Sequence, residues 1–263
     1  RRFAIGGAHH QERHRDRLFG LAYRMTGSVA DAEDLVQEAW LRWQRADLAS
    51  VRNDEAYLVS TTTRLALDRL TSATARRVEY VGPWLPEPLL DATAPSQPEA
   101  AAVLADSLTF AFLVLLDALT PPERAVFLLR EVFGYSYDEV AAATNRTAAS
   151  CRQLVHRARR KLDEGQVAPG RGPDERERRM LDALVGAVIA GDVDALVQLL
   201  APDVVLLSDG GPDRHAARVP VRGPDRVARL CVSLGKRLAP TAVGEIVPVN
   251  GAPALVQRDD GRV

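Results

Sequence analysis

The chain has 263 residues and a formal net charge of −1, with 46% hydrophobic and 26% charged residues. This composition is ordinary for globular domains and the length suggests two or three of them, which excludes low-complexity and fibrous proteins. Cys151 and Cys231 lie far apart and in no cluster with histidine, so we expect no disulfide, no metal site and no cofactor. The most apolar segment, 108–119, is too short to cross a bilayer, and the first residues lack the apolar core of a secretory signal. We therefore expect a cytoplasmic protein without a membrane partner.

Residues 1–75 are predicted to be helical, with a polar loop at 45–53. One helix can begin after Ser28, which is a good capping residue, and its first turn is acidic, which suits the helix dipole. A second helix is expected from about Asp54. The first helix has apolar residues at helical spacing, namely Leu35, Val36, Ala39, Trp40 and Trp43.

Proline distinguishes residues 76–100, which hold five of the sixteen prolines in the chain. Because proline fixes the backbone φ angle and prevents helix formation, we predict an extended linker here. The linker also carries apolar side chains, among them Trp84 and Leu85. A spacer surrounded only by solvent has no need of them, so we expect this segment to dock onto another part of the protein.

Residues 101–165 are predicted to form a second helical domain. After a helix at 108–119, Thr120 can cap the next helix, which has proline at its first position. The last two predicted helices, 137–144 and 147–162, are joined by a short turn. Apolar residues three and four positions apart place one stripe of the longer helix against the shorter one, as in a helix-turn-helix.

The longer helix of this pair is strongly basic. Between Arg146 and Leu162 there are six basic residues and no acidic one. Such a helix fits the major groove of DNA, where some side chains meet base edges and others meet phosphates. The candidates for base contact are Ser150, Arg152 and Gln153, and His156 lies on the same exposed face. Phosphate contacts are expected from Arg157, Arg159, Arg160 and Lys161. A helical hairpin with a solvated basic face is the alternative, and a repressor would fit this pattern as well as any other DNA-binding protein.

Glycine and proline at 166–173 predict a hinge, and 174–263 is predicted to be an α+β domain with a curved antiparallel sheet. Asp209-Gly210-Gly211 is most simply a turn, and we see no convincing acid–base pair for catalysis. A turn signal near residue 260 stands where another strand is expected, so we expect the sheet to be incomplete at residue 263. The predicted helices are 174–200, with a break near 191, and 225–234, and the predicted strands are 204–207, 216–221, 243–249 and 254–257.

Several of these segments resemble the extracytoplasmic-function sigma factors, which direct bacterial RNA polymerase to promoters. Residues 31–42 (DAEDLVQEAWLR) and 57–70 resemble region 2 of that family, and residues 119–124 (LTPPER) with the helix-turn-helix resemble region 4. Three motifs in the right order are more specific than any one of them. Residues 80–88 (YVGPWLPEP) and the Asp-Gly-Gly triplet are similar to the linker and to a Gly-rich signature of the subgroup with a SnoaL-like C-terminal domain.

The resemblance implies a multidomain protein that is not an enzyme. Its implied partners are core RNA polymerase, through the β′ coiled coil and the β flap, and promoter DNA, whereas an anti-sigma factor is unknown. The alternative is a DNA-binding module fused to a SnoaL-like small-molecule enzyme or ligand sensor. The implied domains are region 2 at 1–75, the linker at 76–100, region 4 at 101–165, the hinge at 166–173 and a SnoaL/NTF2-like cone at 174–263.

The resemblance also implies roles for individual residues, in addition to −35 recognition by the basic helix. The β′ coiled coil would be bound by Asp34, Gln37, Glu38, Leu41 and Arg42, and the spacing of Glu38 and Arg42 allows them to pair. The melted −10 element would be held by Arg52, Asn53, Arg64 and Arg69, although many relatives have asparagine at the place of Arg64. The C-terminal domain would touch the linker through Trp84, Leu85, Pro86, Asp209, Gly210 and Gly211.

Overall fold

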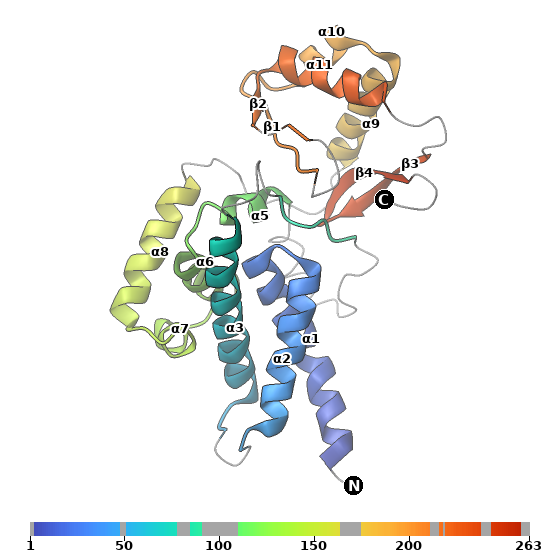
Figure 1. Cartoon of the computed structure of the whole chain (residues 1–263). Coiled ribbons are helices and arrows are strands. Elements are labelled where there is room, and N and C mark those ends of the chain that lie inside the picture. The colour runs from blue at the N-terminus through green and yellow to red at the C-terminus, as the bar shows by residue number, and fades with distance from the viewer. Residues whose placement is uncertain are drawn as a thin grey trace. The chain divides into compact units, whose positions relative to one another are not determined.

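The computed structural model describes residues 3–47, 51–77, 85–90, 110–163, 175–210, 216–217, 219–237 and 243–258. The chain forms two compact units, whose elements are labelled in Figure 1. The helical unit consists of Arg1–Glu79 and Ala94–Gly170, and the C-terminal unit consists of Tyr80–Thr93 and Arg171–Val263. The middle of the proline-rich linker therefore belongs to the C-terminal unit. The predicted hinge at 166–173 lies outside the described residues.

Three long helices, α1 (Phe3–Thr26), α2 (Val29–Arg45) and α3 (Asp54–Arg77), pack against one another in the helical unit. α2 begins as predicted, because the Ser28 hydroxyl accepts a hydrogen bond of 3.3 Å from the backbone N–H of Asp31. Its buried side is the apolar stripe seen in the sequence, with Ala32, Leu35, Val36, Ala39 and Trp40.

The same unit continues with α5 (Phe110–Leu116), α6 (Pro121–Phe127), the π-helical segment η2 (Leu128–Val132), α7 (Tyr137–Thr144) and α8 (Ala148–Asp163). Thr120 and Glu123 form a capping box at the start of α6, which confirms the predicted cap. The helix predicted to reach residue 119 ends at Leu116 instead. The next three backbone N–H groups bond to carbonyls three positions back, which tightens the chain into a turn.

The helix-turn-helix prediction is confirmed for α7 and α8. Asn145 follows the last residue of α7 as its C-cap, and its backbone is left-handed (φ 53°, ψ 48°), a conformation that asparagine adopts more readily than most residues. Thr147 then caps α8, since its hydroxyl accepts a hydrogen bond of 3.2 Å from the Ser150 N–H. The two helices share a buried core of Val140, Cys151, Val155 and Ala158.

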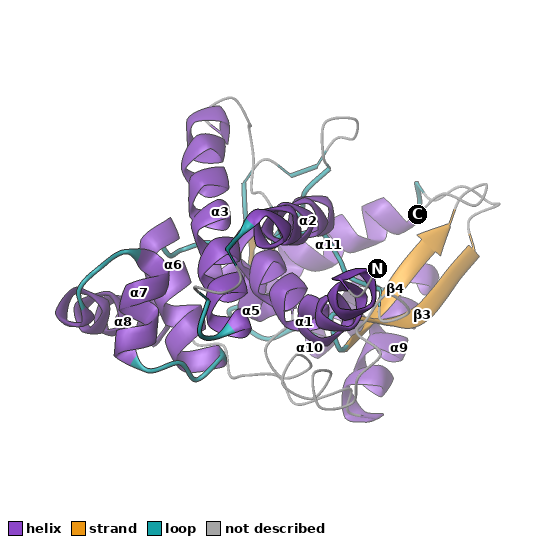
Figure 2. Ribbon diagram, turned by 90° about the horizontal axis from the view of Figure 1, so that it is seen from below, coloured by secondary structure: helices purple, strands orange, loops and turns teal. Residues whose placement is uncertain are grey.

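The C-terminal unit contains α9 (Glu175–Ala190), α10 (Val193–Leu199) and α11 (Pro224–Gly235). Two antiparallel strand pairs accompany them: β1 (Val205–Leu206) with β2 (Val221–Arg222), and β3 (Val243–Val249) with β4 (Ala252–Arg258), the long hairpin in Figure 2. Asn250 and Gly251 both have positive φ (51° and 73°), as a tight two-residue hairpin turn requires. The core of this unit is built around Leu196, Ala228 and Val232.

The α+β prediction for this unit is confirmed, as is the helix break at Gly191, where φ is +69°. The strand predicted at 216–221 was wrong for most of its length, because the described residues before Val221 are not in a strand. Pro220 has no N–H to donate to a ladder, which explains why β2 starts only after it. The described strands form two separate pairs rather than one curved sheet.

No helix within the described ranges is long and apolar enough to cross a bilayer. The described residues also contain no group of three or more His, Cys, Asp or Glu side chains placed to hold a metal ion. Both cysteines are free, with Cys151 buried between α7 and α8 and Cys231 half-buried on α11.

Candidate nucleic-acid interface

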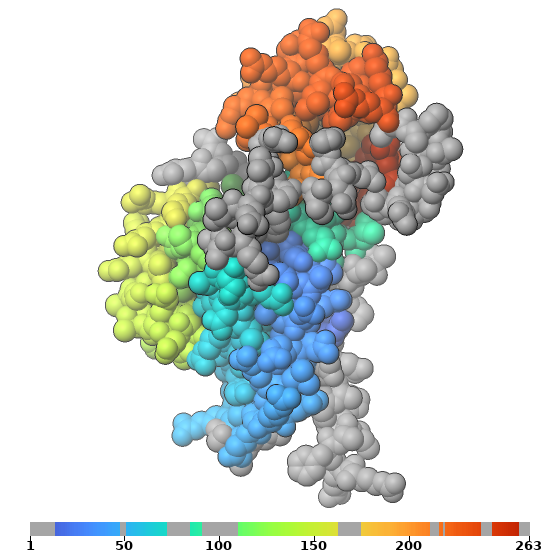
Figure 3. All heavy atoms as spheres, viewed as in Figure 1, coloured from blue at the N-terminus to red at the C-terminus, as the bar shows by residue number. Residues whose placement is uncertain are grey.

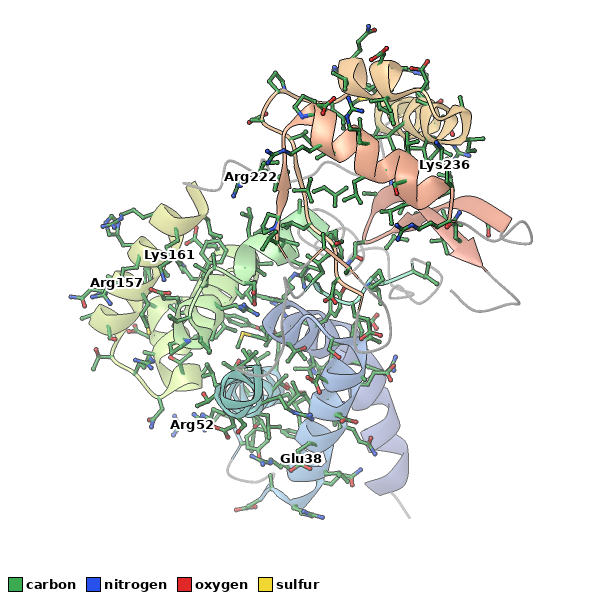
Figure 4. All side chains as sticks on the ribbon, turned by 45° about the horizontal axis from the view of Figure 1, so that its top comes forward. Glu38, Arg52, Arg157, Lys161, Arg222 and Lys236 are labelled. Atoms are coloured by element: carbon green, nitrogen blue, oxygen red, sulfur yellow. The ribbon has the colours of Figure 1, made fainter. Side chains whose placement is uncertain are left out.

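α8 presents a basic face to solvent. Its apolar stripe packs on α6 and α7, so the side chains on the opposite side of the helix point outward. α8 forms an edge of the helical unit in Figure 3, and Arg157 and Lys161 are labelled on it in Figure 4. Of the predicted −35 residues, Ser150 and Lys161 are half-buried, and the exposed ones are Arg152, Gln153, His156, Arg157, Arg159 and Arg160.

Two cations of α8 pair with carboxylates from the preceding elements. Arg159 lies 2.7 Å from Glu131, and 57% of the Arg159 side chain remains exposed. Lys161 lies 2.7 Å from Glu123. Burial alone would raise the pKa of Glu123, but hydrogen bonds from Lys161 and Thr120 outweigh it and lower that pKa. The Arg159 pair is partly exposed and therefore weak, so Arg159 stays accessible to a phosphate. The Lys161 pair joins α8 to a buried carboxylate of α6.

Arg52 and Asn53, predicted to hold the −10 element, are both exposed and precede α3. Asn53 also caps α3, because its side-chain oxygen accepts a hydrogen bond of 3.0 Å from the Ala56 N–H. Arg52 is labelled in Figure 4. Part of the preceding loop, residues 48–50, lies outside the described residues.

Arg64, from the same predicted set, is bound to the end of α7. Its guanidinium donates to the carbonyl oxygens of Ala142 (2.7 Å) and Ala143 (3.2 Å). The last carbonyls of a helix have no partner within the helix, so a guanidinium is favoured there. Arg64 therefore joins α3 to the helix-turn-helix within the helical unit.

Arg69, the last of the predicted −10 residues, is paired with acidic residues of α2. Its guanidinium lies 2.8 Å from Asp31 and 3.4 Å from Asp34. Asp34 was predicted to contact the polymerase, so one ion-pair cluster contains residues from two predicted binding sets. The structure shows both residues partly exposed, at the junction of α2 and α3.

The other residues predicted to bind the polymerase lie on the exposed side of α2. Glu38, labelled in Figure 4, accepts a hydrogen bond of 2.9 Å from Arg42, which confirms the predicted pair. Leu41 is 39% exposed beside them, and Gln37 is exposed one turn earlier. An exposed leucine framed by charged and polar groups is a surface suited to a protein partner.

Sequence reasoning missed the contacts that tie α1 and α3 to the start of the helix-turn-helix. The Tyr135 hydroxyl donates to Glu55 at 2.8 Å, and Arg17 lies 3.2 Å from the same carboxylate. Burial is the larger cause that raises the pKa of Tyr135, and the hydrogen bond to Glu55 raises it further. The Phe133 ring lies under the guanidiniums of Arg17 (5.8 Å) and Arg24 (5.3 Å), and burial lowers the pKa of Arg24 to about 9. These partners are too far apart in the chain for any periodic signal to reveal them.

Within the C-terminal unit, linker residues Leu89 and Leu90 pair with the turn end of the β3–β4 hairpin, and Leu85 bonds to Asp209. The Leu85 N–H donates to the Asp209 carboxylate at 2.9 Å, a role that the turn interpretation of Asp209 did not include. Leu89 exchanges two hydrogen bonds of 2.9 Å with Asn250, one through the buried Asn250 side chain. Leu90 forms an antiparallel bridge with Val249.

The described part of the linker packs within the C-terminal unit. Pro86 and Leu89 are buried, and Gly210 is half-buried beside Asp209. Trp84 and Gly211 lie outside the described residues. Asn250 was not predicted from the sequence, in which only the Asn-Gly hairpin turn could have drawn attention to it.

An open pocket of about 440 Å³ lies between α9 and α10. Its lining is dominated by alanines and also includes Gly186, Gln198 and Leu199. Asp192 is the ionisable residue of this described lining, and its carboxylate caps α10 by accepting from the Ala195 N–H at 2.9 Å. These residues supply no pair of acid and base for catalysis.

Comparison with known proteins places these features in a family. Residues 11–76 match the model "Sigma-70 region 2" and residues 109–162 match "Sigma-70, region 4". The chain is 39% identical over 239 residues to the ECF RNA polymerase sigma factor SigJ of Mycobacterium tuberculosis, covering 90% of this chain and 76% of that protein. It is 36% identical over 246 residues to the probable ECF RNA polymerase sigma factor SigI of the same species, covering 92% and 81%. The crystal structure of SigJ matches with a TM-score of 0.75 at 36% identity, covering 96% of this chain and 86% of that one.

Proposed function

The chain belongs to the extracytoplasmic-function sigma factors, alternative sigma factors that direct RNA polymerase to initiate transcription at specific promoters, and from this we propose how its residues divide the work. The exposed face of α8 reads the −35 element. Arg52, Asn53, Arg64 and Arg69 hold the −10 strand. The exposed side of α2 binds the β′ coiled coil of the polymerase, and the helix-turn-helix module binds the β flap. We place this activity in the cytoplasm, where RNA polymerase acts.

The observation that carries the −35 assignment is the basic face of α8 opposite its buried stripe. A phosphate contact neutralises one charge on DNA and releases counterions, so affinity acquires a salt dependence that scales with the number of contacts. Arg157 and Arg160 are exposed toward the end of α8 and suit this role. Arg152, nearer its start, suits a bidentate contact with guanine, which is worth about 1–3 kcal/mol of discrimination.

The test uses the full chain with core RNA polymerase and a promoter fragment selected from a random duplex pool. Replacing Arg157 or Arg160 by alanine should weaken promoter binding for all sequences alike and lower the salt slope by about 1. Arg226 is an exposed arginine on α11, and Arg226→Ala is the matched control, which should leave the salt dependence of binding unchanged. An unchanged slope in both α8 variants would refute the assignment.

Arg64 imposes a condition on promoter binding. Because its guanidinium is bound to the end of α7, Arg64 holds a DNA strand only after it gives up these hydrogen bonds. We propose that binding to core polymerase breaks them by separating α3 from α7. Spin labels at exposed Gln44 of α2 and Gln153 of α8 should move apart when core polymerase is added, and an unchanged distance distribution would contradict the proposal.

We also propose that the C-terminal domain regulates the sigma factor in cis through the linker. Residues 85–90 lie in the chain between the helices of region 2 and those of region 4, so their capture limits how freely those regions separate. A catalytic role for the C-terminal domain is less favoured, because Asp192 in the pocket serves as a helix cap. The supporting contacts are the hydrogen bonds of Leu85 and Leu89.

Asp209→Ala tests this regulation, since it leaves the Leu85 N–H without its acceptor. In this variant, run-off transcription with core polymerase should change, and hydrogen exchange of residues 85–90 should become faster. Asp203→Ala, at an exposed position in the same unit, serves as the control. If the linker exchanges faster while transcription stays the same, the linker contact has no regulatory role.

A further inference from the structure

Arg152, which we assign to base reading, lies against the ring of Tyr137 at the start of α7. We propose that Tyr137 is a positioning residue for −35 specificity, holding the Arg152 guanidinium ready for the base edge. This inference rests on the proposed function, because Arg152 reads a base only if α8 enters the major groove. Tyr137 itself was not among the residues that the sequence indicated for DNA recognition.

Two guanidiniums, those of Arg130 and Arg152, contact the aromatic ring of Tyr137. The guanidinium carbon of Arg152 lies 5.3 Å from the ring centroid of Tyr137, and that of Arg130 lies 4.8 Å from the same centroid. Arg130 is itself anchored, because it donates a hydrogen bond of 2.9 Å to the carbonyl oxygen of Tyr135. Both distances are within the range of favourable cation–π contacts.

The ring of Tyr137 is attached to a rigid part of the backbone. Ser136, immediately before it, is the N-cap of α7 and forms a capping box with Glu139. The Ser136 hydroxyl and backbone N–H bond to the Glu139 carboxylate at 2.7 Å and 2.8 Å, and these hydrogen bonds lower the pKa of Glu139. The carboxylate is therefore charged at neutral pH and the cap is complete, which holds the backbone from which the ring projects.

A guanidinium can use its face and its edge at the same time. The contact with Tyr137 is an attraction between the charge of Arg152 and the ring, whereas guanine recognition uses the N–H groups of the guanidinium, which lie in its plane and are not used by this attraction. An unrestrained arginine samples many rotamers and loses that freedom on binding, so an arginine already held against a ring binds with a smaller loss. From the strength of exposed cation–π contacts we expect the ring to contribute about two- to fivefold to base discrimination.

The test measures a ratio between bases rather than affinity alone. The full-length protein with core RNA polymerase is bound to a duplex pool randomised across the −35 segment, and the bound fraction is sequenced. Four proteins are compared with the natural one: Arg152→Ala, Tyr137→Leu, Tyr137→Phe and Arg160→Ala. Thermal unfolding of each variant checks that the helix-turn-helix is intact.

We expect Tyr137→Leu to reduce discrimination about two- to fivefold at the same base pair that Arg152→Ala affects. Tyr137→Phe should keep the profile, because it keeps the ring, and Arg160→Ala should weaken all sequences equally. Suppose that Arg152→Ala alters the base preferences. If Tyr137→Leu then weakens binding to all sequences equally, or leaves the base preferences unchanged, the positioning role is wrong and the proposed function stands. Loss of discrimination in Tyr137→Phe would likewise overturn it, since the hydroxyl and not the ring would then matter. A profile that Arg152→Ala does not change removes Arg152 as a reader, and this inference fails together with that assignment.

Discussion

Asn250 is the residue whose replacement most directly tests how the linker is held. Its side-chain oxygen accepts the Leu89 N–H at 2.9 Å, and both residues are almost fully buried, at 1% and 3% exposure. Asn250 also has a φ of 51°, so an alanine there would strain the hairpin turn. We therefore choose Asn250→Gly, which removes the acceptor and tolerates the backbone conformation.

The expected magnitude follows from leaving one buried N–H without an acceptor. That loss costs about 1–3 kcal/mol, which corresponds to a local opening equilibrium about 5- to 150-fold more favourable. The return bond from the Asn250 N–H to the Leu89 carbonyl does not depend on the side chain and should persist. The linker should therefore loosen around Leu89 without unfolding the hairpin.

Hydrogen exchange on the intact protein is the suitable assay, with peptides that cover 85–90 and 243–258. Exchange should accelerate in the linker peptide and change little in β3 and β4. Asn250→Asp keeps an acceptor oxygen and is the matched control. Equal protection of the Leu89 amide in Asn250→Gly and in the natural protein would show that this hydrogen bond does not hold the linker.

Three further predictions concern stability. Because burial raises the pKa of Tyr135 in the folded state, the contribution of its hydroxyl is complete below the ordinary pKa of about 10 and is lost as the pH rises further. Denaturant titrations of the natural protein and Tyr135→Phe should thus give unfolding free energies that differ by about 1 kcal/mol at neutral pH and by less above pH 10. A difference that stays constant with pH would contradict the predicted loss of the hydroxyl contribution. Leu196→Ala should lower the stability of the C-terminal unit by about 2–5 kcal/mol. Calorimetry should show this as a shift of one unfolding transition, whereas an equal shift of all transitions would argue against independent cores. Asn145→Ala should destabilise the helix-turn-helix by about 1 kcal/mol because of its left-handed backbone, and Asn145→Gly should not; equal melting temperatures would refute that reason.

Much of the fold could be predicted because its signals are local. The start of α2 depends on Ser28 and the start of α6 on Thr120 and Glu123, all within one helical turn of their partners. The apolar stripe of α8 likewise predicted which face is buried and, by exclusion, which face is basic and exposed. The errors fell where local signals compete, as at the end of α5, where a turn replaced the expected helix.

The candidate site was predictable only in part, for the same reason. Ser150, Arg152 and Gln153 could be assigned to one face from their spacing in a single helix. Arg64 looked equally available in the sequence, yet its guanidinium is bound to α7. The role that we propose for Tyr137 depends on a residue fifteen positions later on a different helix, and helical periodicity does not extend across the turn between them.

By itself the sequence determined the helices, their caps, the basic face of α8 and the family, because each of these depends on residues close together in the chain. Only the tertiary structure decided that Arg64 closes the end of α7, that Tyr135 bonds to Glu55 and that the linker pairs with Asn250. The helical spacing of apolar residues predicts which face of a helix is buried, since burial of apolar area is favourable against any packing partner. It does not report which distant segment supplies that partner, because this choice depends on the packing of whole elements against one another.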